Sequence, residues 1–112
     1  MPYTINGLEQ AIPNPQMKDG TTFVPLADVS DTLGGYVDFD HESKTANVEL
    51  GAKKAKVTAN DTSVESAGAT ISLQAAPYIE NDTMWVPVRF FQHVFDCELN
   101  VDGDNVSIKR PL

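Results

Sequence analysis

An internal repeat constrains the fold of this 112-residue chain more than any other feature of its sequence. The segment Thr22–Leu26, which reads TFVPL, returns 62 residues later as Met84–Val88, which reads MWVPV. Each copy is followed by a stretch with apolar residues at helical spacing and then by a stretch that alternates apolar and polar residues. Because internal repeats mark repeated structural units, the sequence predicts two copies of one unit, at about residues 3–50 and 63–110.

A short amphipathic helix is predicted after each copy of the repeated segment. The β-prone stretches end at Pro25 and Pro87, and proline suits the first position of a helix. The apolar residues that follow recur at positions i, i+3 and i+7, namely Leu26, Val29 and Leu33 in the first unit and Val88, Phe91 and Phe95 in the second. This spacing is typical of a two-turn helix with one apolar face. Gly34-Gly35 is expected to end the first helix, whereas Asp96-Cys97 is a weaker stop for the second.

Strands are predicted for most of the remaining chain. Residues 37–40 and 46–50 alternate in polarity and indicate one hairpin, and residues 99–101 and 106–108 indicate another around the turn pair Asp102-Gly103. Between the units, further strands are expected at Ala55–Val57, Thr62–Glu65 and Thr70–Leu73. Ile12–Gly20, with two prolines and few apolar residues, is interpreted as the one long loop.

These elements predict the α+β fold class. Helices of two turns bury little apolar surface by themselves, so each is expected to lie across an antiparallel sheet. The shared order of strand, proline, helix and hairpin predicts that the two repeats are related by a pseudo-twofold axis. At this length, residues 1–112 are expected to form a single domain made of both repeats.

Composition limits the classes of partner. Sixteen acidic residues against eight basic ones give a net charge of −8, which disfavours binding to a nucleic-acid backbone. Basic proteins, cations or simple solubility are the alternatives that this charge leaves. No apolar run is long enough to predict a membrane-spanning helix. The start at Met1 lacks the pattern of a secretory signal, which favours either a cytoplasmic protein or one expressed without its targeting segment.

Two segments carry a resemblance to a known family. Met17–Leu26 and Ala76–Arg89 each contain a turn, a short strand ending in Val-Pro, and the start of a helix that leads to a hairpin. This combination, which covers nearly the whole chain, resembles the copper amine oxidase N-terminal-like domain, or stalk domain, of Gram-positive bacteria and their phages. Ala27 stands where that family usually has arginine, which Arg89 keeps, and Asp96-Cys97 stands where it has glycine and a small residue. The resemblance implies a non-catalytic appendage of a cell-surface or secreted protein.

Catalytic, cofactor and metal sites are not expected. An amine oxidase needs several imidazole ligands for its copper and a tyrosine that becomes the quinone cofactor, but the chain has only His41 and His93, on separate predicted elements. The cluster of Asp38, Asp40 and Glu42 lacks the spacing of a helix-loop-helix calcium site. Cys97 is the only cysteine, and its apolar register predicts a buried, inert thiol. No enzyme activity, no cofactor and no metal are therefore predicted.

The second predicted helix has a wider apolar face than the first. Phe90 and Val94 take the positions where the first helix has Asp28 and Thr32. Either these side chains pack within the chain, or, together with Arg89, they form a candidate interaction surface for a partner or for a second copy in a homodimer.

The sequence therefore favours a non-catalytic binding or spacer module, with an unidentified protein or cell-envelope ligand as its partner and neither nucleic acid nor membrane as a target. The alternative is a free-standing acidic intracellular protein, phage-encoded in one version, that acts as an inhibitor or ligand-binding protein. The first reading places the chain at the cell surface or outside the cell, and the second places it in the cytoplasm.

Overall fold

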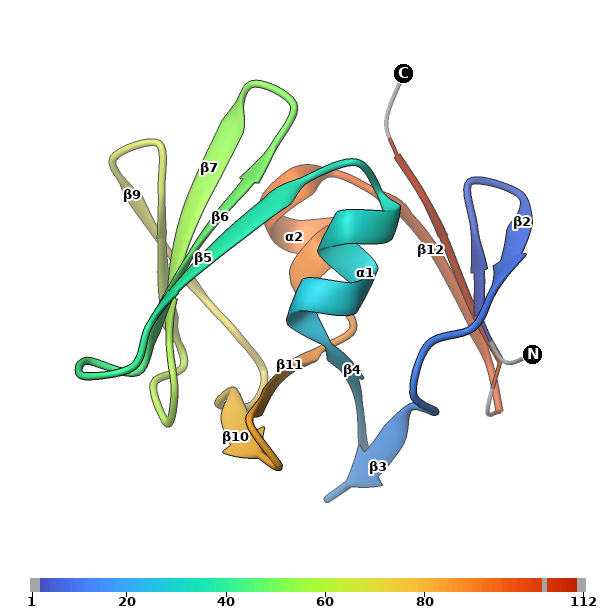
Figure 1. The fold of residues 1–112 in the computed structure, drawn as a ribbon, viewed down its shortest axis with the longest axis horizontal. Helices are drawn as coiled ribbons and strands as arrows, with labels where there is room; N and C mark the ends of the chain where they lie inside the picture. Colours follow the sequence, from blue (N-terminus) through green and yellow to red (C-terminus); the bar gives the residue numbers. More distant parts are fainter. Residues whose placement is uncertain (1–2, 104, 111–112) are drawn as a thin grey trace.

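The computed structural model describes residues 3–103 and 105–110, which form three β-sheets that surround two short helices from below and from both sides in the view of Figure 1. The central sheet has the strand order β10 (Tyr78–Glu80), β11 (Thr83–Pro87), β4 (Thr21–Pro25), β3 (Gln16–Lys18). One flanking sheet has the order β5 (Tyr36–Asp40), β6 (Thr45–Leu50), β7 (Lys53–Thr58), β8 (Ser63–Ser66), β9 (Ala69–Ser72). The other has the order β12 (Glu98–Asp102), β13 (Asn105–Lys109), β1 (Tyr3–Ile5), β2 (Leu8–Gln10). The mostly antiparallel sheets and two helices confirm the α+β class.

The two copies of the repeated segment lie side by side in the central sheet, which we call the base sheet. Strands β4 and β11 pair antiparallel, with Val24 opposite Val86 and Phe23 opposite Pro87. Both strands end at their proline, and a helix begins within three residues of it: α1 (Leu26–Thr32) after β4 and α2 (Phe90–Phe95) after β11. The prediction of a short helix after each Val-Pro pair is therefore confirmed.

The helices end in the same way although their stop residues differ. After α1, Gly34 has a φ of +90°, and after α2 the C-cap Asp96 has a φ of +57°. Aspartate is one of the few residues with a side chain that visits this left-handed region routinely. Asp96 therefore gives the end of α2 the left-handed residue that Gly34 gives the end of α1, although the sequence predicts a weaker stop at Asp96-Cys97.

The flanking sheets join segments that are far apart in the sequence. In one of them the N-terminal hairpin β1–β2 is added to the C-terminal hairpin β12–β13, through a parallel pairing of β1 with β13. In the other the hairpin β8–β9 is added to β5–β6 through the intervening strand β7. Each flanking sheet therefore combines an early hairpin of one half with the late hairpin of the other half.

The interpretation of Ile12–Gly20 as one long loop is wrong for its second part. Gln16–Lys18 forms strand β3, which pairs with β4 across a tight turn in which Asp19 and Gly20 both have positive φ. β3 is an edge strand without a buried face, and Met17 is 65% exposed. An edge strand of this kind carries no apolar alternation, which is the pattern that predicts the other strands.

One apolar core fills the space between the three sheets and the two helices. Phe90, Phe91 and Phe95 of α2 lie at its centre, with their rings packed edge to face at centroid distances of 5.1 and 5.6 Å. Strands of all three sheets contribute to it, with Val24 and Val86 from the base and alternate residues such as Val48 and Ile108 from the sides. The core is continuous across both halves of the chain.

Candidate functional site

A groove beside the core opens where α1 begins, between the inner face of β5 and β6 and the turn that joins β10 to β11. We call it the first groove; its volume is about 410 Å³. Its lining consists of an apolar floor and a charged rim, formed by Pro25, Leu26, Ala27, Asp28, Val37, Phe39, His41, Lys44, Ala46, Ile79, Asp82, Thr83 and Met84.

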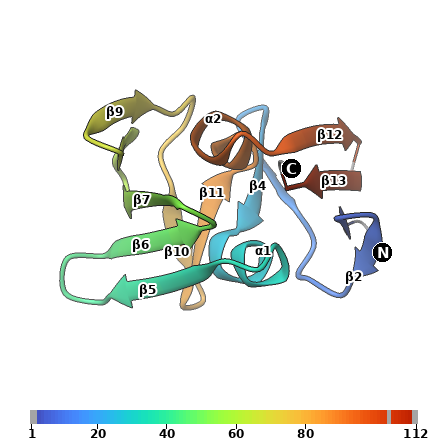
Figure 2. The same ribbon diagram turned by 90° about the horizontal axis from the view of Figure 1, so that it is seen from above.

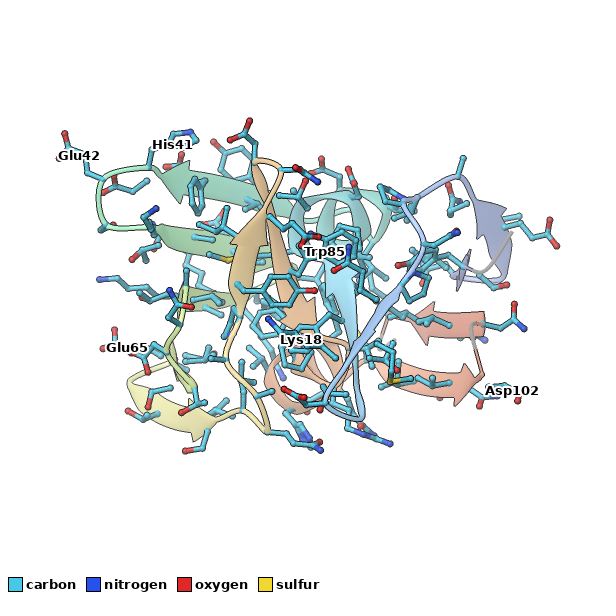
Figure 3. The ribbon with its side chains drawn as sticks, turned by 90° about the horizontal axis from the view of Figure 1, so that it is seen from below. Lys18, His41, Glu42, Glu65, Trp85 and Asp102 are labelled. Carbon is cyan, nitrogen blue, oxygen red and sulfur yellow. The ribbon has the colours of Figure 1, made fainter. Side chains whose placement is uncertain are left out.

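Strand alternation explains the floor of the first groove. Successive side chains of a strand point to opposite faces, so Val37 and Phe39 of β5 face inward while Asp38 and Asp40 face solvent. Because β5 is the last strand of its sheet, Val37 and Phe39 are only half-buried. The ring of Phe39 meets that of His41 edge to face at 4.8 Å. Figure 3 shows His41 and Glu42 at the far end of the β5–β6 hairpin, away from Trp85.

A second groove, of about 320 Å³, opens where α2 begins. Its lining consists of Gly20, Thr21, Thr22, Gln74, Pro87, Val88, Arg89 and Val101. Seven of these eight residues lie 62 positions from a residue that lines the first groove, which is the offset of the repeated segment. The two grooves thus occupy corresponding places beside the two helices.

The two grooves differ in chemistry. Arg89 in the second groove corresponds to Ala27 in the first, and Val101 corresponds to the larger Phe39. The guanidinium of Arg89 donates a hydrogen bond to Oε1 of Gln92 at 3.0 Å. The second groove is therefore cationic and polar, whereas the first has a larger apolar floor.

The candidate interaction surface on the second helix is mostly interior. Phe90 is 0% exposed and Val94 is 4% exposed, because both side chains pack into the core. Of the two alternatives for the wide apolar face, packing within the chain describes Phe90 and Val94. The prediction that these two side chains belong to an interaction surface is therefore corrected. Arg89 is exposed and lines the second groove.

The structure does not bring together a set of copper ligands. His41 lies in the turn after β5, and His93 is exposed on α2. Within residues 3–103 and 105–110, no group of three or more His, Cys, Asp and Glu side chains is placed to hold a metal ion. Copper in an oxidase site needs a cluster of imidazoles, so the residues described do not fit such a centre.

The remaining residues considered for chemistry have structural settings. Burial raises the pKa of the Cys97 thiol to about 11, so the thiol is neutral at neutral pH. Asp40 accepts a hydrogen bond from the backbone N–H of Glu42 at 3.0 Å, and hydrogen bonds from residues 42 and 43 lower the pKa of its carboxyl group. Tyr3 is buried, which raises the pKa of its phenol, as does the nearby charge of Asp28.

Sequence reasoning missed both grooves. The first groove takes its residues from three separate stretches of the chain, residues 25–28, 37–46 and 79–84, which no local motif connects. The signal that could have revealed them is the repeat itself. When the sequence is aligned with itself at the offset of 62, Pro25-Leu26 aligns with Pro87-Val88 and Phe39 aligns with Val101, and these aligned residues line the two grooves.

These features define a class of protein: a small α+β module that presents two corresponding grooves beside a shared core. The chain belongs to the family described as the copper amine oxidase N-terminal domain, whose model matches residues 4–109. This membership confirms the resemblance and supports a non-catalytic module. None of the described helices is long and apolar enough to cross a membrane.

One curated relative extends the comparison. The chain is 33% identical over 88 residues to a protein of Brevibacillus choshinensis named "Protease inhibitor". The match covers 79% of this chain and 27% of that relative, so the chain spans about a quarter of the relative's length.

Proposed function

We propose that the chain is a non-catalytic protein-binding module that holds its partner in the first groove. The observation that carries this proposal is the groove's composition: an apolar floor that includes Phe39 and Ile79, bordered by charged groups such as Lys44 and Asp82. An apolar recess with a few polar groups at its rim is the common form of a binding site. Family membership supports a non-catalytic module.

Site-specific crosslinking tests this function. A photoreactive amino acid would replace Lys44 at the rim of the first groove, and in a matched variant it would replace Lys109, which is exposed on β13 outside both grooves. Both proteins would be irradiated with extracts of the cells that encode the chain. A discrete adduct from position 44 and none from position 109 would support binding in the groove. Equal labelling, or none, would contradict it and favour a spacer.

We also propose that the two halves, residues 3–50 and 63–110, are tandem repeats related by a pseudo-twofold axis. The pairing of Val24 with Val86 supports it, because residues at the repeat offset meet at the centre of the base sheet. The common offset of the two grooves is a second support. An experimental structure in which the two halves do not superpose after a half-turn would refute this relationship.

Protease inhibition is the second candidate function, and the name of the Brevibacillus choshinensis relative is the observation that favours it. It corresponds to the alternative predicted from the sequence, a free-standing acidic intracellular inhibitor. The chain would be titrated against serine, cysteine and metalloproteases of known active-site concentration. Stoichiometric loss of activity with an intact chain would support inhibition, and cleavage of the chain as a substrate would exclude it.

A further inference from the structure

Strand β5 forms a long, unpaired edge next to the first groove. In the strand order of its sheet β5 is terminal, so one side of its backbone has no partner strand among the described residues (Figure 2). β5 and β12, with five residues each, are the longest of the described edge strands, since β9 has four and β2, β3 and β10 have three each. Free N–H and C=O groups on such an edge are a template for another extended chain. A partner strand placed there would lie at the opening of the first groove.

The side chains of β5 set the chemistry of that partner. Asp38 and Asp40 are exposed on the outer face, and Val37 and Phe39 face the groove. Directly opposite residues of paired strands interact, and like charges placed opposite each other are destabilising. A matching strand therefore needs basic residues on one face and apolar residues on the other.

The sheet already contains a strand of this kind at β7. β7 pairs with β6 so that Lys54 lies opposite Glu49 and Lys56 opposite Asn47 on the outer face. The Nζ atom of Lys54 is 3.2 Å from Oε1 of Glu49. On the inner face Ala55 meets Val48. An alternating lysine and apolar segment thus complements a strand of this sheet, and β5 is left without one.

A second copy of the chain does not satisfy this edge. Two β5 strands paired edge to edge would bring the acidic pair Asp38 and Asp40 against another acidic pair, in a chain of net charge −8. The corresponding edge strand β12 offers the same alternation, but its groove holds the cation Arg89, which repels a basic segment.

We propose that the free edge of β5 binds an extended basic segment of a partner protein by strand addition, with the apolar side chains of that segment in the first groove. This inference rests on the proposed binding function and names the chemistry of its partner. Main-chain hydrogen bonds would supply affinity, and the alternate side chains would supply specificity, as in other cases of strand addition.

A designed peptide tests the proposal. The probe is acetyl-Lys-Val-Lys-Val-Lys-Val-Lys-amide with a fluorescent label, and binding is measured by anisotropy. A saturable one-to-one complex is expected, together with slowed amide exchange in β5. Asp38→Lys should weaken binding at least about tenfold. Glu98→Lys makes the same charge change on the other edge and should leave the affinity within about twofold.

Three controls make the result decisive. A peptide with glutamate in place of each lysine, and one with alternate N-methylated residues, should both fail to bind. Asp38→Asn serves in place of Asp38→Lys should the latter not fold, with a smaller expected loss. Equal binding of the N-methylated peptide, or equal loss in the Glu98 variant, would overturn strand addition at β5. Discrete crosslinking from position 44 that Asp38→Lys leaves unchanged would overturn this inference and leave the binding function standing.

Discussion

The two helices occupy corresponding places in the chain and yet differ in what surrounds them. Phe90 of α2 is completely buried and joins the aromatic centre of the core, whereas Asp28, at the corresponding position of α1, is exposed beside the first groove. The second half therefore supplies the aromatic centre of the core, and the first half supplies most of the residues that line the first groove. The two helices follow the same backbone pattern, and side-chain differences such as Phe90 against Asp28 account for their different surroundings.

Replacing Phe90 by aspartate should have the largest effect on this division. The change removes an aromatic side chain from the core and buries a charge, so we expect a loss of at least about 3–5 kcal/mol in the free energy of unfolding. Urea denaturation followed by near-ultraviolet circular dichroism would measure it. Asp28→Asn, at the corresponding exposed position, should change stability by less than about 0.5 kcal/mol. Comparable losses in the two variants would contradict the comparison.

The backbone was more predictable than sequence identity suggested. Gly20 and Gly34 of the first half have aspartate at the corresponding positions 82 and 96, which weakened the repeat as read from the sequence. All four residues nevertheless have positive φ. Aspartate tolerates this conformation, so the turns are retained where the glycines are not. Strand β3 could not be predicted, because an exposed edge strand imposes no apolar period.

Gly35 and Cys97 occupy corresponding positions after the ends of α1 and α2. Substitutions at these two positions should change stability less than Phe90→Asp does. A Cβ atom on Gly35 would lie 2.5 Å from the carbonyl oxygen of Glu49, whereas Cys97 carries a side chain that is 3% exposed. Gly35→Ala should therefore force a backbone shift and cost about 1–3 kcal/mol. Cys97→Ala removes only a small buried group and should cost about 1 kcal/mol. If Gly35→Ala were as stable as the parent in thermal unfolding, the close approach of β6 would be disproved.

The thiol of Cys97 should make the stability of the domain sensitive to alkaline pH. Burial raises its pKa from an ordinary 9.0 to about 11, so between these values the unfolded chain loses the thiol proton before the folded chain does. Stability should be fully retained below pH 9 and should fall as the pH rises toward 11. The pKa of Tyr3 is also raised, from 10.0, so the comparison belongs below pH 10. In Cys97→Ala the denaturation midpoint should change less between pH 9 and 10 than in the parent protein. An equal change in both proteins would refute the assignment of this pH dependence to Cys97.

The candidate site was less predictable than the fold for a physical reason. A helix position reads as apolar whether it faces the core or a partner, so the width of the apolar face on α2 did not separate the two alternatives. Phe90 and Val94 face inward because both flanking sheets and the base sheet contribute to one core around α2. The first groove depends on the distance between β5 and the β10–β11 turn, which no local sequence pattern encodes.

The smallest expected difference lies between the cations at the two helix ends. Nη1 of Arg110 donates to the carbonyl oxygen of Leu33 at 3.1 Å, and its backbone N–H donates to Oδ1 of Asn6 at 2.9 Å. At the end of α2, Lys53 pairs with Asp96, with side chains that are 48% and 66% exposed. Arg110→Ala leaves a carbonyl of α1 without its charged donor and should cost about 1 kcal/mol. Lys53→Ala breaks an exposed ion pair and should cost less than about 0.5 kcal/mol.

Thermal unfolding of both variants at low and high salt would separate these contributions. For a domain of this size, about 1 kcal/mol corresponds to a shift of roughly 4 °C in Tm. The Lys53 effect should disappear at high salt, because exposed pairs are screened, and the Arg110 effect should persist, because its partner is a half-buried carbonyl. A larger, salt-insensitive loss in the Lys53 variant would mean that the end of α2, and not that of α1, is the helix end that depends on its cation.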